Sequence, residues 1–280
     1  MFVLIQGHSA SVRSAIVQAG GSPGTSIANI TTARVPVSAL ASLAGDPVVE
    51  KIERATPKRL RNTQAAVHTG AKKAHDATSP LTQAYTGKGV IVGIIDSGID
   101  WRHRDFRDPT DSTKTRILAI WDMDDETGPS PDGFAYGTVW TREQINAALR
   151  GEGTIRQTDT NGHGTHVAGS AVGNGSASGS HRGIAYEADI VVVKGQSAVD
   201  GSSFVFGMAD ALGKPAVINF SQGTHFGPHD GTTMEEQAVN GLLQAKSGRV
   251  FVTAAGNEGD SFVHWGGFAL AADSAWTYYH

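Results

Sequence analysis

The sequence predicts an α/β protein in which a doubly wound parallel sheet is preceded by a small α+β unit. From residue 89 onward, short β-branched runs alternate with helical patterns, as expected for parallel strands that are buried on both faces. The first 53 residues instead combine four strand-like runs with two helical ones. Between these parts, residues 55–88 are polar and irregular and carry a basic group at 58–61, which places a domain boundary near Arg61.

The N-terminal unit, residues 1–61, has the pattern of a ferredoxin-like sandwich. Apolar runs predict strands, and apolar residues at helical spacing predict helices. A glycine-rich segment at residues 20–24 predicts a turn. Together these elements follow the ferredoxin-like order. The expected strands span residues 2–5, 27–30, 32–37 and 48–53, and the expected helices span residues 11–19 and 37–43.

The larger unit, residues 62–280, is predicted to hold the parallel sheet. Because its strands alternate with helices, we expect helices on both faces of that sheet. The expected strands span residues 90–95, 190–193, 216–220 and 250–254, and the expected helices span residues 141–150, 165–172, 204–212 and 233–245.

Composition narrows the classes of function. The 280-residue chain carries 23 basic and 27 acidic residues, so we expect protein or peptide partners and neither nucleic acid nor membrane. Cysteine is absent, which excludes a thiol nucleophile, disulfides and cysteine-ligated metals. Residues 1–5 are apolar only briefly and lack a basic start, so they predict neither a signal peptide nor an anchor. Secretion would require a longer precursor, and the compartment stays open.

Chemically suggestive residues follow three of the four predicted strands of the larger unit. Asp96 directly follows the first strand, Ser221 and Gly223 follow the third, and Asn257 follows the fourth. His163 opens a helix of small residues. Ligands of open α/β sheets bind where strands end. A carboxylate, an imidazole and an amide at that edge suit acyl transfer, in which a histidine takes a proton from a serine and an amide stabilises the oxyanion.

Each of these residues alone fits a turn or a helix cap, but their motifs together are specific. D-S-G-I-D at 96–100, H-G-T-H-V-A-G at 163–169 and A-A-G-N-E-G at 254–259 resemble, in this order, the subtilisin-like serine proteases. The resemblance implies that Asp96 and His163 are the acid and base of the triad and Asn257 the oxyanion donor. It implies a cleft that pairs with an extended peptide, with residues 200–202 on its opposite rim. The implied substrate-binding residues are Ser221, Gly223, Ala254, Ala255 and Gly256.

The resemblance also suggests a metal ligand and a role for the N-terminal unit. Asp105 matches a position where many subtilases hold structural calcium, although the chemistry itself requires no cofactor. The acidic segment 122–126 lacks the glycine spacing of a helix-loop-helix calcium loop, which favours a solvated loop. His166 is expected to be a packed structural residue. Residues 1–61 resemble the family's inhibitory propeptide, whose tail would be residues 56–61; the alternative is a permanent N-terminal domain.

The nucleophilic serine is the part of the family pattern that the sequence lacks. The family carries it in G-T-S-x-A-x-P, downstream of the oxyanion asparagine, and nothing after Asn257 matches. Ser261 and Ser274 lack the flanking glycine, and Ser26 lies in a similar motif that reads as a strand. Two interpretations stay open. The chain is either the N-terminal part of an endopeptidase, with an incomplete sheet and a missing C-terminal portion, or a peptide-binding pseudoprotease. We expect the 280-residue chain alone to be inactive.

Overall fold

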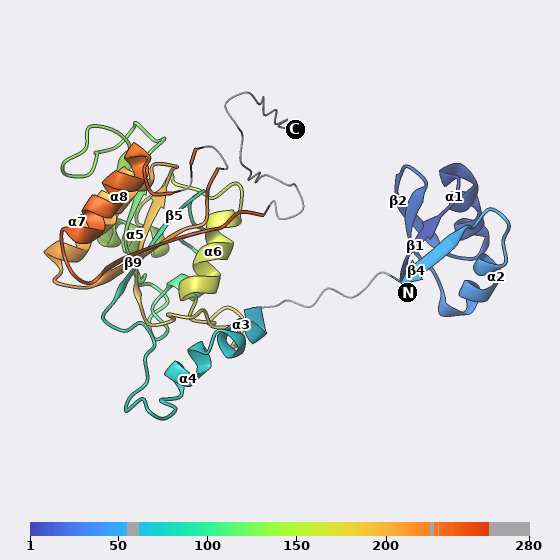
Figure 1. Ribbon diagram of the computed structural model, residues 1–280, viewed down its shortest axis with the longest axis horizontal. Coiled ribbons are helices and arrows are strands. Elements are labelled where there is room, and N and C mark those ends of the chain that lie inside the picture. The colour runs from blue at the N-terminus through green and yellow to red at the C-terminus, as the bar shows by residue number, and fades with distance from the viewer. Residues whose placement is uncertain (55–61, 225–226, 229, 258–280) are drawn as a thin grey trace, which may run out of the picture. The chain divides into compact units, whose positions relative to one another are not determined.

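The computed structural model forms two compact units, Met1–Leu60 and Arg61–His280 (Figure 1). The predicted boundary and tail at 56–61, as well as Ser261 and Ser274, lie outside the described residues. The structure describes residues 1–54, 62–224, 227–228 and 230–257.

The N-terminal unit is a four-stranded antiparallel sheet packed against helix α1. Its strand order is β2-β3-β1-β4, and its elements follow one another as β-α-β-β-α-β. Val3 and Ile5 of β1 are buried against Val12 and Ile16 of α1. The elements are β1 (Phe2–Gln6), α1 (Ser9–Gln18), β2 (Ser22–Ile27), β3 (Ile30–Arg34), the 3-10 helix η1 (Val37–Ala39), α2 (Leu40–Ala44) and β4 (Lys51–Arg54).

One strand predicted in this unit is wrong. Residues 28 and 29 form the hairpin turn between the end of β2 at Ile27 and the start of β3 at Ile30, and Ala28 has a φ of 50°. The apolar pair Ile27 and Ile30 flanks the turn, and Ile27 is 73% exposed, so the pattern came from residues that do not share a strand. Ser26 lies in β2, where its hydroxyl is 2.9 Å from the hydroxyl of Thr31.

The larger unit contains a six-stranded sheet within the described residues, in the order β10-β9-β5-β8-β6-β7. The predicted strands correspond to β5, β8, β9 and β10, and the predicted helices to α5, α6, α7 and α8. The elements are α3 (Asn62–His68), α4 (Ala71–His75), β5 (Ile91–Asp96), the 3-10 helix η2 (Arg104–Phe106), β6 (Ile117–Asp122), β7 (Thr138–Thr141), α5 (Arg142–Leu149), α6 (His163–Val172), β8 (Asp189–Lys194), α7 (Ala198–Ala211), β9 (Ala216–Phe220), α8 (Met234–Gln244) and β10 (Arg249–Thr253).

The prediction of a wholly parallel sheet is wrong at one edge. Strand β7 runs antiparallel to β6, whereas all other neighbouring strands are parallel. β7 has only four residues and leads directly into α5, whose capping box begins at Thr141. Its direction is therefore fixed by the long loop that returns from β6 rather than by a signal in its own sequence.

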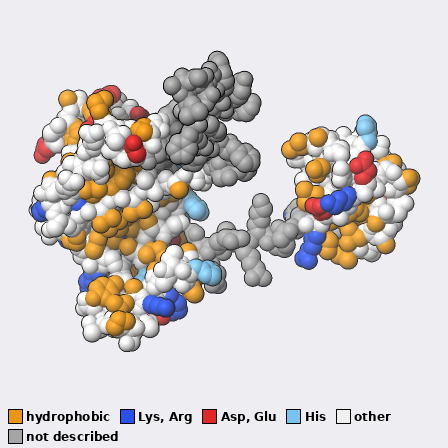
Figure 2. Space-filling view, viewed as in Figure 1, with side chains coloured by type: hydrophobic (Ala, Val, Ile, Leu, Met, Phe, Trp, Pro, Cys, Tyr) orange, Lys and Arg blue, Asp and Glu red, His pale blue; other side chains and the backbone are white. Residues whose placement is uncertain are grey.

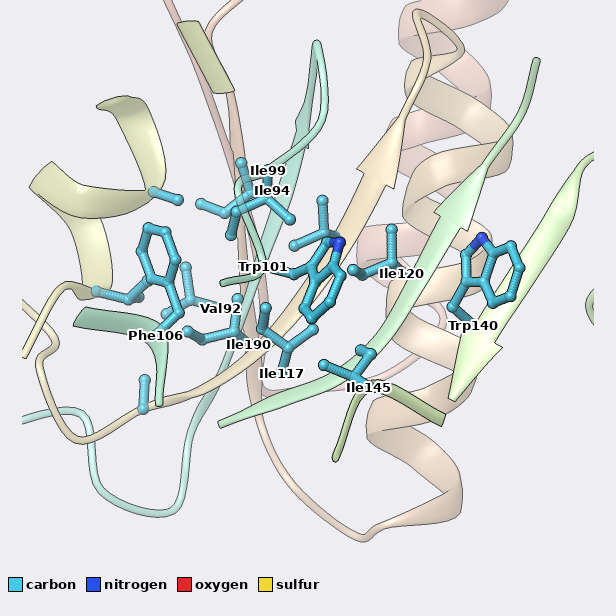
Figure 3. Close-up of a cluster of buried hydrophobic side chains, with 14 of the residues drawn as sticks. Val92, Ile94, Ile99, Trp101, Phe106, Ile117, Ile120, Trp140, Ile145 and Ile190 are labelled. Carbon is cyan, nitrogen blue, oxygen red and sulfur yellow. The ribbon is translucent and has the colours of Figure 1, made fainter. Parts of the chain in front are cut away.

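Alternate residues of the central strands pack into two cores. Val92 and Ile94 of β5 join the core beneath α5 and α6, with Trp101, Phe106 and Ile117 (Figure 3). Ile91 and Ile95 of the same strand point to the opposite face and join a second core with residues of α7. Burial of each such side chain stabilises the fold by about 1.5–3 kcal/mol. The sheet is thus covered on both faces, and α6 packs against β5.

Strand β10 lies at the other edge of the sheet and is more exposed. Val250 and Val252 are 47% and 50% exposed. Apolar side chains also lie on the visible surface of both units (Figure 2). In the described part of the chain, no helix has the length and apolar character needed to cross a membrane.

Candidate active site

Asp96 and His163 meet at the carboxyl ends of the parallel strands. Asp96 is the last residue of β5, and His163 is the first residue of α6. The two atoms Nδ1 of His163 and Oδ1 of Asp96 are 2.7 Å apart. The side chain of Asp96 is 1% exposed and that of His163 is 49% exposed. A buried carboxylate therefore orients an accessible imidazole, and no hydrogen bond engages Nε2 of that ring within the described residues.

Two glycines allow helix α6 to approach the strand end. A Cβ atom on Gly164 would lie 2.2 Å from the carbonyl oxygen of Gly98 and 3.2 Å from Cβ of Asp96. Gly98 has a φ of 119°, a conformation that side chains disfavour. The approach that joins His163 to Asp96 therefore depends on the absence of side chains at both positions.

Asp159 caps helix α6, because the N-cap residue Gly162 has no side chain to do so. Its carboxylate accepts hydrogen bonds from Gly162 N (2.9 Å), Thr165 N (2.8 Å) and Thr165 Oγ1 (2.6 Å). It also accepts one from Ser97 Oγ (2.8 Å), which in turn accepts from Gly164 N (2.9 Å). Burial alone would raise the pKa of Asp159, but these hydrogen bonds hold that pKa below its ordinary value. Asp159 thus ties the start of α6 to the loop after β5.

A row of charged residues crosses three adjacent strand ends. Asp96 of β5 is in register with Lys194 of β8, which is in register with Asp122 of β6. The ammonium of Lys194 pairs with the buried carboxylate of Asp122 at 3.0 Å. The sequence analysis missed Lys194 and placed Asp122 in a solvated loop, although a lone lysine directly after the apolar run 190–193 is a recognisable signal.

A cleft of about 400 Å³ opens at this edge of the sheet. Gln222 forms part of its wall by donating hydrogen bonds from Nε2 to the carbonyl oxygens of Ile95 and Gly195, at 3.1 and 3.0 Å. The amide therefore bridges the ends of β5 and β8. Besides Asp96 and His163, the lining includes Asp124, Asn161, Lys194, Gln196 and Gln222.

The predicted substrate-binding residues lie at the same edge but outside the lining of this cleft. Ser221 accepts a hydrogen bond from Asn219 Nδ2 at 2.9 Å, and Ala254 N donates to Phe220 O at 3.2 Å. Asn257 is exposed, four residues after β10 ends. The roles predicted for these residues stay predictions. They are Ser221, Gly223, Ala254, Ala255, Gly256 and Asn257.

Residues 200–202 do not form an exposed rim. They lie in the first turns of α7, where Gly201 and Ser202 are buried. A Cβ atom on Gly201 would lie 2.8 Å from Ile95 Cδ1, so this turn packs directly on β5. Asp200 accepts a hydrogen bond from Tyr136 OH at 2.7 Å. The prediction was wrong because the helix begins at Ala198, six residues before the predicted start.

Asp105 holds a loop through a backbone contact. Its Oδ1 accepts a hydrogen bond from Ala177 N at 2.7 Å. No group of three or more potential metal ligands is assembled anywhere in the described residues. Calcium also binds backbone and amide oxygens, so a calcium ion at Asp105 stays a prediction, and it enters no step below.

The acidic segment 122–126 is partly neutralised rather than simply solvated. Asp122 is 3% exposed and pairs with Lys194, and Asp125 pairs with Arg156 at 3.2 Å.

His166 is exposed, so the expectation that it is a packed residue is wrong. It lines a second cavity of about 390 Å³ with His103 and His181, beside Gly169. Only one of the two histidines of α6 therefore contacts Asp96.

Comparison with known proteins identifies relatives of the chain. A sequence model of the subtilase family matches residues 87–276. The chain is 28% identical over 228 residues to subtilisin of Bacillus sp. (strain TA39), a match that covers 75% of this chain and 45% of the relative. It is 31% identical over 179 residues to the major intracellular serine protease of Bacillus subtilis (strain 168), covering 62% of this chain and 44% of the relative.

A solved structure shows the same fold. The CspB protease of Clostridium perfringens superposes with a TM-score of 0.58 at 31% identity, covering 70% of this chain and 42% of that chain. The chain therefore spans less than half the length of each of these three relatives.

Proposed function

The chain belongs to the subtilase family, and we propose that it supplies the acid, base and oxyanion donor of a serine endopeptidase. The observation that carries this proposal is the 2.7 Å contact between Asp96 and Nδ1 of His163. The buried carboxylate accepts a hydrogen bond from Nδ1–H, which leaves Nε2 as the basic nitrogen. The nucleophilic serine comes from sequence outside this chain, and the short coverage of the relatives supports that arrangement.

The proposed reaction follows from these positions. As the serine oxygen bonds to the carbonyl carbon of the peptide, its proton moves to Nε2 of His163, and Asp96 stabilises the imidazolium. The side-chain amide of Asn257 donates to the oxyanion. The imidazolium then protonates the leaving amine as the C–N bond breaks. A water molecule repeats the sequence on the acyl-enzyme and releases the new carboxylic acid.

We further propose that residues 1–61 act as a propeptide that assists folding and inhibits the enzyme. The β-α-β-β-α-β order of that unit supports the proposal. Made as a separate peptide, the unit should inhibit the mature protease and be cut from it during maturation. Mass spectrometry that finds an intact N-terminus in fully active enzyme would favour a permanent domain.

The catalytic proposal is tested in the complete protein with a fluorophosphonate, which labels only an activated serine. Labelling and peptide hydrolysis should both fall in His163→Ala, by about ten thousandfold or more, because the serine then lacks its base. His166→Ala is the matched control, since this exposed histidine of the same helix should leave labelling intact. Normal labelling of His163→Ala would refute the assignment. A complete protein that binds peptides but neither labels nor cuts would be the pseudoprotease of the alternative interpretation.

A further inference from the structure

The cleft beside His163 contains an acidic side chain that has no partner among the described residues. Asp96 is hydrogen-bonded to His163, and Lys194 is paired with Asp122. Asp124 lines the same cleft and is exposed. Its backbone N–H donates to Asp122 Oδ1 at 3.2 Å, but its own carboxylate has no ion pair or hydrogen bond among the described residues. The fixed charge left facing the cleft is therefore negative.

The neighbouring acids show that this charge is not a general property of the segment. Asp122 is neutralised by Lys194, and Asp125 by Arg156 together with a hydrogen bond from Thr127. Glu126 is exposed and does not line the cleft. Of the four acids between residues 122 and 126, Asp124 alone combines an unpaired carboxylate with a place in the wall that also holds His163.

We propose that Asp124 makes the cleft select a lysine or arginine side chain of the substrate, at a position close to the scissile bond. This inference rests on the proposed endopeptidase function, since a peptide seated for attack near His163 must pass the same wall. An ammonium or guanidinium is the peptide group that complements a lone carboxylate. The extended stem of either side chain also allows its charge to reach the cleft wall while the backbone stays at the strand ends.

The expected preference is moderate. An ion pair at an exposed site changes a binding constant by up to about fivefold, and a bound peptide that excludes water strengthens the pair. We expect peptides with lysine at the selected position to be cut about three to ten times more efficiently than peptides with norleucine there. The preference should weaken as ionic strength rises, because salt screens such charges.

The test compares N-acetylated peptides that carry lysine, norleucine or glutamate at each position around the cleaved bond. Norleucine keeps the four-carbon stem of lysine but lacks the ammonium. kcat/KM is measured for the complete enzyme, and Kd for the same peptides is measured with the His163→Ala protein. Asp124→Asn should abolish the lysine preference, and Asp124→Lys should reverse it in favour of glutamate. Glu126→Gln is the matched control and should keep the preference, because this nearby acid lies outside the cleft lining.

The two readouts separate this inference from the proposed function. A protein that cuts none of the peptides but binds the lysine peptides more tightly, in a manner that depends on Asp124, would support the inference and overturn the endopeptidase. Equal lysine-to-norleucine ratios in wild type and Asp124→Asn, by both measurements, would overturn the inference. The same peptides are also measured with a free N-terminus. A preference seen only in that set would overturn the inference too, because the recognised cation would then be the terminal ammonium.

Discussion

Replacement of Gly164 by alanine should separate helix α6 from the end of β5. The new Cβ atom would lie 2.2 Å from the backbone oxygen of Gly98, an atom that cannot move like a flexible side chain. Overpacking of this kind costs about 1–3 kcal/mol. Alanine recovers up to about 1 kcal/mol of helix propensity. We therefore expect a net loss of about 1–2 kcal/mol.

Gly169→Ala is the matched control for this prediction. Gly169 lies in the same helix, but a Cβ atom there would meet nothing within 4 Å. The control should therefore be stabilised by up to about 1 kcal/mol. For a unit of about 200 residues, each kcal/mol shifts Tm by about 2–4 °C. Thermal unfolding followed by circular dichroism should show Gly164→Ala about 2–8 °C below wild type and Gly169→Ala slightly above it.

The same substitution should disturb the site more than the fold. A displacement of about 1 Å in a catalytic group can cost about a hundredfold in rate. We expect NMR of the ring nitrogens of His163 to show loss of the hydrogen bond at Nδ1 in Gly164→Ala, and turnover of the complete enzyme to fall accordingly. If Gly164→Ala has the same Tm as Gly169→Ala and keeps that hydrogen bond, the close approach of α6 to β5 does not position His163.

Two further predictions concern hydrogen-bonded acids. Asp159→Asn should destabilise the protein by about 1 kcal/mol at pH 7, because the cap of α6 loses its charge. The pKa of Asp159 is held below its ordinary value, so the difference from the variant should be constant at neutral pH and shrink as pH falls below about 4; an unchanged difference at pH 3 would refute this. Burial and the hydrogen bond to Asp200 raise the pKa of Tyr136 to about 12, so Tyr136→Phe should cost about 1 kcal/mol below pH 10. Urea unfolding should show this difference decline between pH 10 and 12, and a difference that grows there would contradict it.

The elements and motifs that the sequence revealed are those set by local spacing. The β-branched runs that became β5 and β8 are buried on both faces, so their composition alone identified them. The motif beginning at His163 carries both the imidazole and the small residues that let α6 approach the end of β5. The subtilase family that this motif indicated is confirmed by the match over residues 87–276. The meeting of His163 with Asp96, 67 residues away, could be expected only because both follow that local pattern.

The features that the sequence did not reveal depend on partners distant in the chain. The direction of β7 is set by its pairing with β6 across a long loop, and nothing within its four residues encodes it. Residues 200–202 read as a polar, glycine-containing segment, yet Gly201 is required where α7 packs on β5. Such contacts arise from tertiary packing, which overrides local propensity.

The acidic segment shows how this difference bears on function. Its composition predicts one charged loop, but Asp125 is neutralised by a residue 31 positions away and Asp122 by one 72 positions away. Only after these pairs are identified does a single carboxylate, that of Asp124, stand out as the charge that faces the cleft. The electrostatic character of the cleft is therefore set as much by Arg156 and Lys194 as by the acids themselves. A relative with the same acidic run but without these partners would present a different charge to its substrate.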